Sequence, residues 1–247
     1  MKTSLKGKVA IVTGGTGAIG TAICRQLADS GARVASNYRN EEKLRHWQEE
    51  NKDYSFFAYK CDVTDFNACK DFVAAVEKEL GPVDILVNNA GITMDTTLRK
   101  MTWEQWNTVL NTNLDSVFNM SRHVVQGMTD RGFGRIINIS SINGQKGQVG
   151  QCNYSAAKAG MHGFTMALAQ EVARKGVTVN TLSPGYIATE MVMAVPEDIR
   201  KQIIAQIPVG RLGTVEDVAY VVDFLAAPEA GFITGADIAA NGGQHMM

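Results

Sequence analysis

Residues 9–20 of the chain read VAIVTGGTGAIG, in which an apolar run passes directly into a cluster of glycines. The run Val9–Thr13 has the near-continuous apolar character of a strand that is buried on both faces of a parallel sheet. A helical pattern from Ile19 to Asp29 follows without a break. A glycine-rich turn between such a strand and a helix is typical of a pyrophosphate site, because the helix N-terminus presents free N–H groups to the anion. The alternative is a plain turn.

The alternation of strand and helix continues along the rest of the chain. Further apolar runs typical of strands lie at Val34–Asn37, Phe56–Lys60, Ile85–Asn88, Arg135–Ser140, Val177–Leu182 and Asp237–Ala240. Helical periodicity lies between them at Glu41–Glu50, Ala68–Glu79, Trp103–Met128, Ser155–Arg174 and Val215–Leu225. This alternation predicts parallel strands joined by crossover helices. We therefore predict one α/β domain over residues 1–247, a Rossmann fold with a doubly wound, seven-stranded parallel sheet and helices on both faces.

The segment 188–211 interrupts this alternation after the sixth predicted strand. It carries Met191, Met193, Pro196 and Pro208. An insertion at this point of a doubly wound sheet hangs over the carboxyl ends of the strands, where ligands bind. We predict that the segment is a small lid over a substrate site, and the alternative is an ordinary pair of surface helices.

The composition argues against several classes of protein. The chain has 24 Lys and Arg against 25 Asp and Glu, so its net charge of −1 gives no reason to expect a nucleic acid partner. No apolar stretch approaches the ~18 residues of a membrane span, and the polar start of the chain lacks the apolar core of a signal peptide. The four cysteines have no paired spacing, so we expect no metal site and no disulfide framework, but reduced thiols in a cytoplasmic protein.

The end of the second predicted strand indicates which nicotinamide cofactor would bind. An enzyme that uses NAD usually has an acidic residue there to hold the ribose 2′-hydroxyl, whereas an arginine can pair with the 2′-phosphate of NADP. The chain reads Ser36-Asn37-Tyr38-Arg39-Asn40 at this point, with no acid before Glu41. The pattern favours NADPH over NADH, and the alternative is that Arg39 is a solvated surface residue.

Five polar side chains are candidates for carbonyl chemistry. Tyr154 and Lys158 lie four residues apart in a predicted helix and therefore share one face. A free tyrosine titrates near pH 10, and a neighbouring ammonium would lower its pKa toward the range useful for proton transfer. Ser140 and Ser141 end the fifth strand, where a hydroxyl could hydrogen-bond a substrate carbonyl. Asn113 is a poor helix former within a predicted helix and could bind backbone or water. A purely structural role is the alternative for each.

Together these residues resemble the short-chain dehydrogenase/reductase family over essentially the whole chain. The resemblance rests on Thr13-Gly14-x-x-x-Ala18-x-Gly20, Asn88-Asn89-Ala90-Gly91, Ser141, Tyr154-x-x-x-Lys158 and Pro184-Gly185. It implies that Asn113, Ser141, Tyr154 and Lys158 are the catalytic residues, with Tyr154 as the general acid in reduction. The family's spacing of thirteen residues before Tyr154 selects Ser141 over Ser140. None of the four histidines is assigned a catalytic role.

The resemblance also implies a set of cofactor-binding residues around the carboxyl ends of the strands. They are Thr13, Gly14, Gly15, Ala18, Ile19, Gly20, Tyr38, Arg39, Cys61, Asp62, Val63, Asn89, Ala90, Gly91, Ile92, Thr93, Tyr154, Lys158, Pro184, Gly185, Tyr186, Ile187 and Thr189. The chain departs from the family pattern at Ala18, where glycine is usual. The added methyl group puts the cofactor's affinity or pose in question without abolishing binding.

The stretches 143–155, 162–171 and 183–189 resemble one group within the family, the reductases of acetoacetyl-CoA in polyhydroxybutyrate synthesis. This implies NADPH-dependent reduction of acetoacetyl-CoA to (R)-3-hydroxybutanoyl-CoA, with the substrate held by Asp95, Lys100, Gln148, Gln151 and Tyr186. One alternative is the 3-oxoacyl-[acyl-carrier-protein] reductase of fatty acid synthesis, which has the same catalytic residues. The other is a non-catalytic, dinucleotide-sensing regulator. Family members are usually tetramers, so we expect a homotetramer that uses the helices Trp103–Met128 and Ser155–Arg174.

Overall fold

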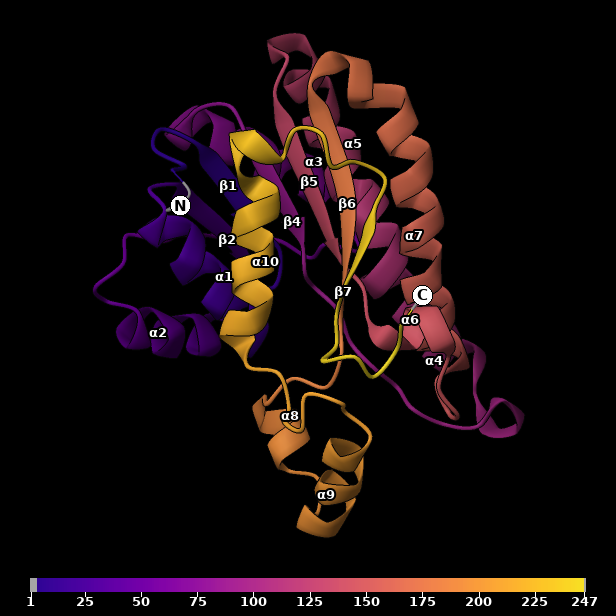
Figure 1. Cartoon of the computed structure of the whole chain (residues 1–247). Helices are drawn as coiled ribbons and strands as arrows, with labels where there is room; N and C mark the ends of the chain where they lie inside the picture. Colours follow the sequence, from indigo (N-terminus) through magenta and orange to yellow (C-terminus); the bar gives the residue numbers. More distant parts are fainter. Residues whose placement is uncertain (1–3, 247) are drawn as a thin grey trace.

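The computed structural model describes residues 4–246, and the predicted seven-stranded parallel sheet is confirmed. Its strands are β1 (Val9–Val12), β2 (Arg33–Tyr38), β3 (Phe57–Lys60), β4 (Ile85–Asn88), β5 (Gly134–Ile139), β6 (Val177–Pro184) and β7 (Asp237–Ala240). They pair in the order β3-β2-β1-β4-β5-β6-β7 (Figure 1). The strand order switches direction at β1, which lies between β2 and β4, and doubly wound sheets bind ligands in the crevice at such a point.

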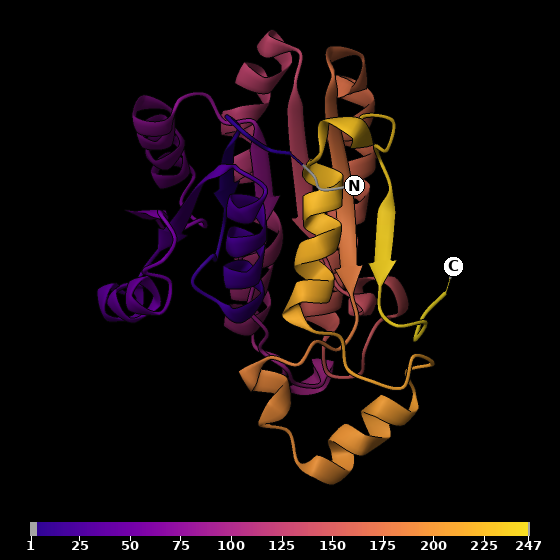
Figure 2. The ribbon, with the colours of Figure 1, turned by 60° about the vertical axis from the view of Figure 1, so that its left-hand side comes forward.

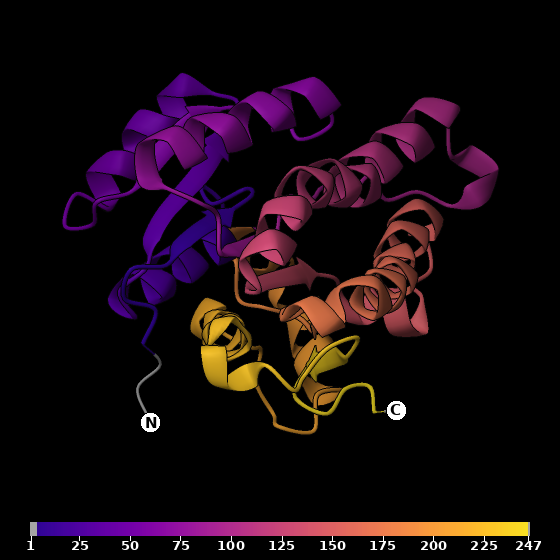
Figure 3. The same ribbon diagram turned by 90° about the horizontal axis from the view of Figure 1, so that it is seen from above.

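Helices cover both faces of the sheet (Figure 3). One face carries α1 (Ala18–Asp29), α10 (Val215–Ala226) and the buried Trp47 of α2 (Glu41–Glu50), and the other carries α3 (Phe66–Leu80), α5 (Ser116–Arg131) and α7 (Cys152–Val172). The side chains of β1 alternate between these two cores. Ala10 and Val12 pack on the α1 side, while Val9 and Ile11 pack on the α3 side. Burial on both faces explains why this strand is a continuous apolar run.

The predicted helical segment Trp103–Met128 is confirmed and runs on to Arg131, but it contains a π-helical turn that the sequence did not predict. The chain forms α4 (Trp103–Leu110), then a π-turn at Asn111–Asp115, then α5. A π-turn holds one extra residue, and such turns are frequent at functional sites. Asn113 lies within this one, and its amide is hydrogen-bonded to the backbone of Ile92, which explains why the regular helix is interrupted here.

The segment 188–211 forms α8 (Glu190–Met193) and α9 (Glu197–Ala205), both beyond the carboxyl ends of the strands. In Figure 2 the arrows of β6 and β7 point toward these two helices. This is the place expected of a lid, whose action on a substrate stays a prediction. Within residues 4–246, no helix combines the length and the apolar character needed to cross a bilayer.

Candidate active site

The glycine turn after β1 is crowded at positions that exclude a side chain. Gly14 has a φ of +66°, which favours glycine. A Cβ on Gly20 would lie 2.7 Å from the Cα of Gly15, so the start of α1 packs directly on the turn. Gly17 is the N-cap of α1 and has no side chain with which to cap the helix, which leaves the first N–H groups available to an anion. This arrangement fits the pyrophosphate of a dinucleotide.

Hydrogen bonds from the neighbouring strands hold this turn in place. Asn37 Oδ1 accepts from the Gly14 N–H at 2.9 Å, and Ser36 Oγ accepts from the Gly15 N–H at 2.9 Å. Thr13 Oγ1 accepts from the N–H groups of Asn89 and Ala90, each at 3.0 Å. The carboxyl ends of β1, β2 and β4 are therefore joined into one platform, in which Ser36 and Asn37 hold glycines that are predicted to bind the cofactor.

Ala18, the departure from the family pattern, is the first residue of α1 and is exposed. It lines a surface hollow with Thr21, Arg25 and Glu216 rather than the crowded side of the turn that Gly20 occupies. The fold thus accommodates the methyl group without strain in the turn. Its effect on cofactor affinity stays a prediction.

The residues predicted to contact the adenosine half lie together at the ends of β2 and β3. Arg39 Nη1 is 3.9 Å from Asp62 Oδ2, and the Arg39 side chain is 62% exposed. Asn37 Nδ2 donates to the carbonyl of Cys61 at 2.9 Å, which ties the two strand ends together. The exposed guanidinium is free to turn toward a phosphate, because an ion pair at this distance and exposure is weak.

Asn113 and Gly91 shape the centre of the site. The buried amide of Asn113 makes two hydrogen bonds to the backbone of Ile92, both at 2.8 Å. Its Nδ2 donates to the Ile92 carbonyl, and its Oδ1 accepts from the Ile92 N–H. A Cβ on Gly91 would lie 2.9 Å from Asn113 Oδ1 and 3.4 Å from Lys158 Nζ. Asn113 therefore fixes the segment after β4, and Gly91 leaves room for the lysine.

Tyr154 and Lys158 lie in the first two turns of α7 with Ser141 beside them. Lys158 Nζ donates to the carbonyl of Ile139 at 2.7 Å and lies 5.6 Å from the centroid of the Tyr154 ring. Burial lowers the pKa of Lys158 to about 7. The pKa of Tyr154 is raised, mainly by burial, while its hydrogen bond with Ser141 lowers it and the charge of Asp95 raises it. The shift is therefore opposite to the lowering by an ammonium that the sequence suggested, and burial favours the protonated phenol.

Ser141 and Ser140 have different partners although they are neighbours. Ser141 is the N-cap of the short helix α6 (Ile142–Lys146), which sequence reasoning missed, and its Oγ accepts from the Asn143 N–H at 3.1 Å. Its hydroxyl lies beside Tyr154, and its donation to a substrate carbonyl stays a prediction. Ser140 is buried and donates to the backbone carbonyl of Lys158 at 2.9 Å. This geometry agrees with the choice of Ser141 as the substrate-facing serine.

Two of the five predicted substrate residues are brought together beside Tyr154. Gln151 Nε2 donates to Asp95 Oδ2 at 2.7 Å, and Gln151 Oε1 accepts from Asn143 Nδ2 at 2.9 Å. Gln148 lies exposed in the same loop as Gln151, and Lys100 lies exposed in the short turn Leu98–Lys100. These two make no contact that defines a site.

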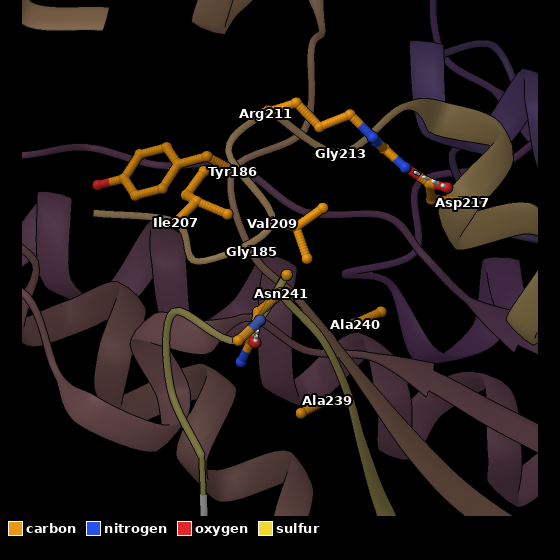
Figure 4. A pocket seen from close by; sticks show the side chains of 12 residues that line it. Gly185, Tyr186, Ile207, Val209, Arg211, Gly213, Asp217, Ala239, Ala240 and Asn241 are labelled. Atoms are coloured by element: carbon orange, nitrogen blue, oxygen red, sulfur yellow. Dashed lines mark hydrogen bonds and ion pairs between the residues drawn. The ribbon is translucent and has the colours of Figure 1, made fainter. Parts of the chain in front are cut away.

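The loop from Pro184 to Thr189 forms the wall toward α8 and α9. The Gly185 N–H donates to the carbonyl of Ala240 at 3.0 Å. A Cβ on Gly185 would lie 2.9 Å from the Cα of Asn241, so the loop packs directly against the end of β7. Behind this loop is a cavity of about 240 Å³ that is lined by Val209, Arg211 and the end of β7 (Figure 4). Tyr186 borders the cavity but points away from the ion pair of Arg211 with Asp217.

Sequence reasoning missed a polar cluster behind the catalytic residues. It comprises Ser140, which directly follows β5, and Gln145, His162, Ser183 and Asp237, which come from α6, α7, β6 and β7. The sequence contains only a weak sign of this cluster. Ser140 and Ser183 lie at or just after the ends of apolar strands, and Asp237 is the first residue of β7. Within residues 4–246, no group of three or more His, Cys, Asp or Glu side chains has the arrangement of a metal site.

Comparison with known proteins agrees with this geometry. The family model for short chain dehydrogenases matches residues 8–200. The acetoacetyl-CoA reductase of Rhizobium meliloti is 60% identical over 240 residues, which are 96% of this chain and 98% of that protein. The acetoacetyl-CoA reductase of Cupriavidus necator is 54% identical over 97% of this chain and 98% of its own.

A second kind of relative is more distant. The 3-oxoacyl-[acyl-carrier-protein] reductase of Vibrio cholerae is 44% identical over 99% of this chain and the whole of its own length. The family match spans more than half of the chain, and both kinds of relative are matched almost from end to end. The chain therefore belongs to the short-chain dehydrogenase family and is an oxidoreductase that acts on a carbonyl or hydroxyl group.

Proposed function

We propose that this protein reduces acetoacetyl-CoA to (R)-3-hydroxybutanoyl-CoA with NADPH, as a step of polyhydroxybutyrate synthesis in the cytoplasm. The observation that carries the proposal is the 60% identity to an acetoacetyl-CoA reductase over nearly the whole chain, together with an intact group of Ser141, Tyr154 and Lys158. Asp95 and Gln151, hydrogen-bonded to each other at 2.7 Å near Tyr154, supply polar groups for a thioester substrate.

The cofactor would be held by the turn after β1 and by the ends of the neighbouring strands. The first N–H groups of α1 would receive the pyrophosphate, Asp62 and Val63 the adenine, and Ile187 and Thr189 the nicotinamide amide. When bound, a nicotinamide cofactor supplies the hydride. Lys158 would hold the nicotinamide ribose from its buried position beside Gly91.

The chain's own residues orient the substrate and move the proton. The Ser141 oxygen accepts from the Asn143 N–H, so its O–H is directed to the substrate carbonyl. Tyr154 is protonated at neutral pH because burial raises its pKa. In the reduction, the phenol would transfer its proton to the carbonyl oxygen, which becomes the hydroxyl of the product. The phenolate regains a proton from solvent before the next turnover.

The choice of substrate is tested by initial rates with two thioesters. We expect kcat/KM for acetoacetyl-CoA to exceed that for the acetoacetyl thioester of an acyl carrier protein, because several relatives of 50–60% identity are named acetoacetyl-CoA reductases. The same assay with NADPH and with NADH tests the cofactor. A greater kcat/KM for the carrier-protein thioester would support the alternative, a 3-oxoacyl-[acyl-carrier-protein] reductase, which the Vibrio cholerae relative represents.

The Arg39→Ala variant tests the preference for NADPH. Its side chain is 62% exposed at the end of β2, where an arginine can pair with a 2′-phosphate. Hydrogen bonds to charged groups contribute about 1.5–3 kcal/mol, so KM for NADPH is expected to rise about tenfold or more, while KM for NADH stays within about twofold. Arg45→Ala, on the exposed side of α2, is the matched control. Equal changes for both cofactors would show that Arg39 does not select the phosphate.

We also propose that the protein is a homotetramer. The helices α5 and α7 each expose a large apolar side chain, Phe118 at 51% and Met166 at 52%. Apolar side chains of this size on neighbouring helices suit burial against further copies of the chain.

A further inference from the structure

A hydrogen-bonded cluster lies behind the catalytic residues, on the side toward β7. We call it the rear network, and it consists of Ser140, Gln145, His162, Ser183 and Asp237. Ser140 and Ser183 are buried, and the side chains of His162 and Asp237 are 19% and 16% exposed. Polar groups at this depth lose free energy unless they are paired, so their partners matter.

The carboxylate of Asp237 is the acceptor at the centre of this network. Its Oδ1 accepts from the Ser183 hydroxyl at 2.7 Å, and its Oδ2 accepts from Gln145 Nε2 at 2.8 Å. His162 Nε2 lies 3.4 Å from the same Oδ2. Only a carboxylate, which accepts through both oxygens and donates through neither, satisfies three such neighbours at once.

The network reaches the backbone of the catalytic lysine through Ser140. The Ser140 hydroxyl donates to the Lys158 carbonyl at 2.9 Å, so its oxygen is left to accept from His162 Nε2, also at 2.9 Å. His162 Nε2 therefore carries the proton that Ser140 accepts. Ser183 Oγ, which donates to Asp237, lies 3.5 Å from the same nitrogen. Hydrogen bonds thus join Asp237 to the Lys158 carbonyl through Ser183, His162 and Ser140.

Asp237 also joins the two helices that carry the catalytic groups. Gln145 belongs to α6, whose N-cap is Ser141, and His162 belongs to α7, which carries Tyr154 and Lys158. A Cβ on Gly144 would lie 2.9 Å from the Lys158 Cβ, so the two helices are in direct contact. A small shift of α6 along α7 would therefore change the distance between the Ser141 and Tyr154 hydroxyls.

We propose that Asp237 is a positioning residue for the carbonyl reduction. It touches neither substrate nor cofactor, and it acts by holding α6 and α7 in the register that presents Ser141 and Tyr154 to one carbonyl oxygen. The inference rests on the proposed function only for the identity of the substrate. A misplacement of about 1 Å in a catalytic group costs up to about a hundredfold in rate.

The test compares Asp237→Leu, which removes the hydrogen bonds from Ser183 and Gln145 and the contact with His162, with Asp237→Asn, which keeps one acceptor oxygen. We expect Asp237→Leu to lower kcat about 10- to 100-fold, with Asp237→Asn between it and the wild type, while KM for NADPH changes less than about threefold. The primary isotope effect on kcat, measured with NADPH deuterated at the transferred position, should rise because the chemical step becomes slower. A smaller fraction of folded enzyme would change neither the isotope effect nor KM.

Asp84→Asn is the matched control. Asp84 has a similar exposure, 13%, and accepts from the Val9 N–H at 3.1 Å, but it lies at the amino ends of the strands. We expect this variant to lower the melting temperature and to leave kcat and the isotope effect unchanged. If Asp237→Leu behaves as Asp84→Asn does, Asp237 is only structural and the proposal is wrong.

A second pair of variants tests the link through His162. Gln can place its Nε2 donor near the position of the histidine Nε2, so His162→Gln should recover most of the kcat that His162→Leu loses. Equal kcat in both variants would overturn the role of the Ser140–His162 link. All ratios are taken on whichever 3-oxoacyl thioester the wild type reduces fastest. A failure of acetoacetyl-CoA as substrate therefore stays separate from a failure of this proposal.

Discussion

The Tyr154→Phe variant is expected to lose almost all turnover and to bind NADPH nearly as the wild type does. The substitution keeps the ring, which packs near Lys158 Nζ, and removes only the hydroxyl that hydrogen-bonds Ser141. Without the phenol, the developing alkoxide has no acid within reach except water. Positioned general acids contribute about 10²–10⁴-fold, so kcat should fall by at least about 10²-fold while the Kd for NADPH, measured by fluorescence titration, changes less than about threefold.

Tyr59→Phe is the control for the loss of a tyrosine hydroxyl. Its hydroxyl donates to Glu79 Oε2 at 2.6 Å on the outer surface near the edge strand β3, far from α7 along the sheet. We expect full activity and at most a small loss of stability in that variant. If Tyr154→Phe retained more than about a tenth of the wild-type kcat, Tyr154 would not be the acid.

The Lys158→Met variant is expected to lose both turnover and cofactor affinity. Lys158 is buried, donates to Ile139 at 2.7 Å and lies against Gly91 at the centre of the site. Its loss removes the group that would hold the nicotinamide ribose and the positive charge nearest to the Tyr154 ring. We expect kcat to fall about 10²–10³-fold, in the range of other catalytic groups, and the Kd for NADPH to rise about tenfold. Lys52→Met, at an exposed ion pair with Glu49, should change neither.

The stability of the Lys158→Met variant should depend less on pH than the stability of the wild type does. Burial lowers the pKa of Lys158 to about 7 in the folded chain, whereas the unfolded lysine has a pKa near 10.4. Between these two values the unfolded state binds the additional proton, so the free energy of unfolding contributed by Lys158 rises with pH from about 7 to about 10. Methionine removes this dependence. Urea unfolding at pH 6 and pH 9 should show that Lys158→Met gains stability relative to the wild type at pH 6 and that this advantage is smaller at pH 9.

A constant difference in unfolding free energy between Lys158→Met and the wild type at both pH values would contradict this account. It would mean that the amine keeps its ordinary pKa in the folded chain. In that case Lys158 would be charged throughout the neutral range, and the ammonium effect on Tyr154 that the sequence suggested would regain weight.

The sheet was predictable because each strand is a short apolar run bounded by polar or glycine residues. All seven runs became strands, with ends shifted by one or two residues, as at Arg33 and Pro184. The helix Trp103–Met128 was predicted as one piece because apolar periodicity continues through it. Its interruption depends on two hydrogen bonds between Asn113 and Ile92, which lie 21 residues apart, and no local pattern carries that information.

The candidate site also combines features that local sequence predicts with features that depend on the whole fold. Tyr154 and Lys158 are four residues apart, so one helix turn was sufficient to bring them together. The rear network joins residues that are up to 92 positions apart, as in the pair Gln145 and Asp237, and only the folded sheet places them in contact. The direction of the Tyr154 pKa was also beyond the sequence, because it depends on how deeply the phenol is buried.

The π-helical turn at Asn111–Asp115 changes the direction in which the side chains of α5 point relative to those of α4. A regular helix advances 100° per residue, so one inserted residue rotates everything after it by about 100° relative to an unbroken continuation of α4. With this offset, Met120, Val124 and Met128 of α5 face the sheet and are fully buried, while Asn113 reaches the segment after β4. Because of the extra residue, α5 can turn its apolar side chains toward the core while Asn113 is directed toward the active site. A regular α-helix would have to meet both conditions with one fixed orientation.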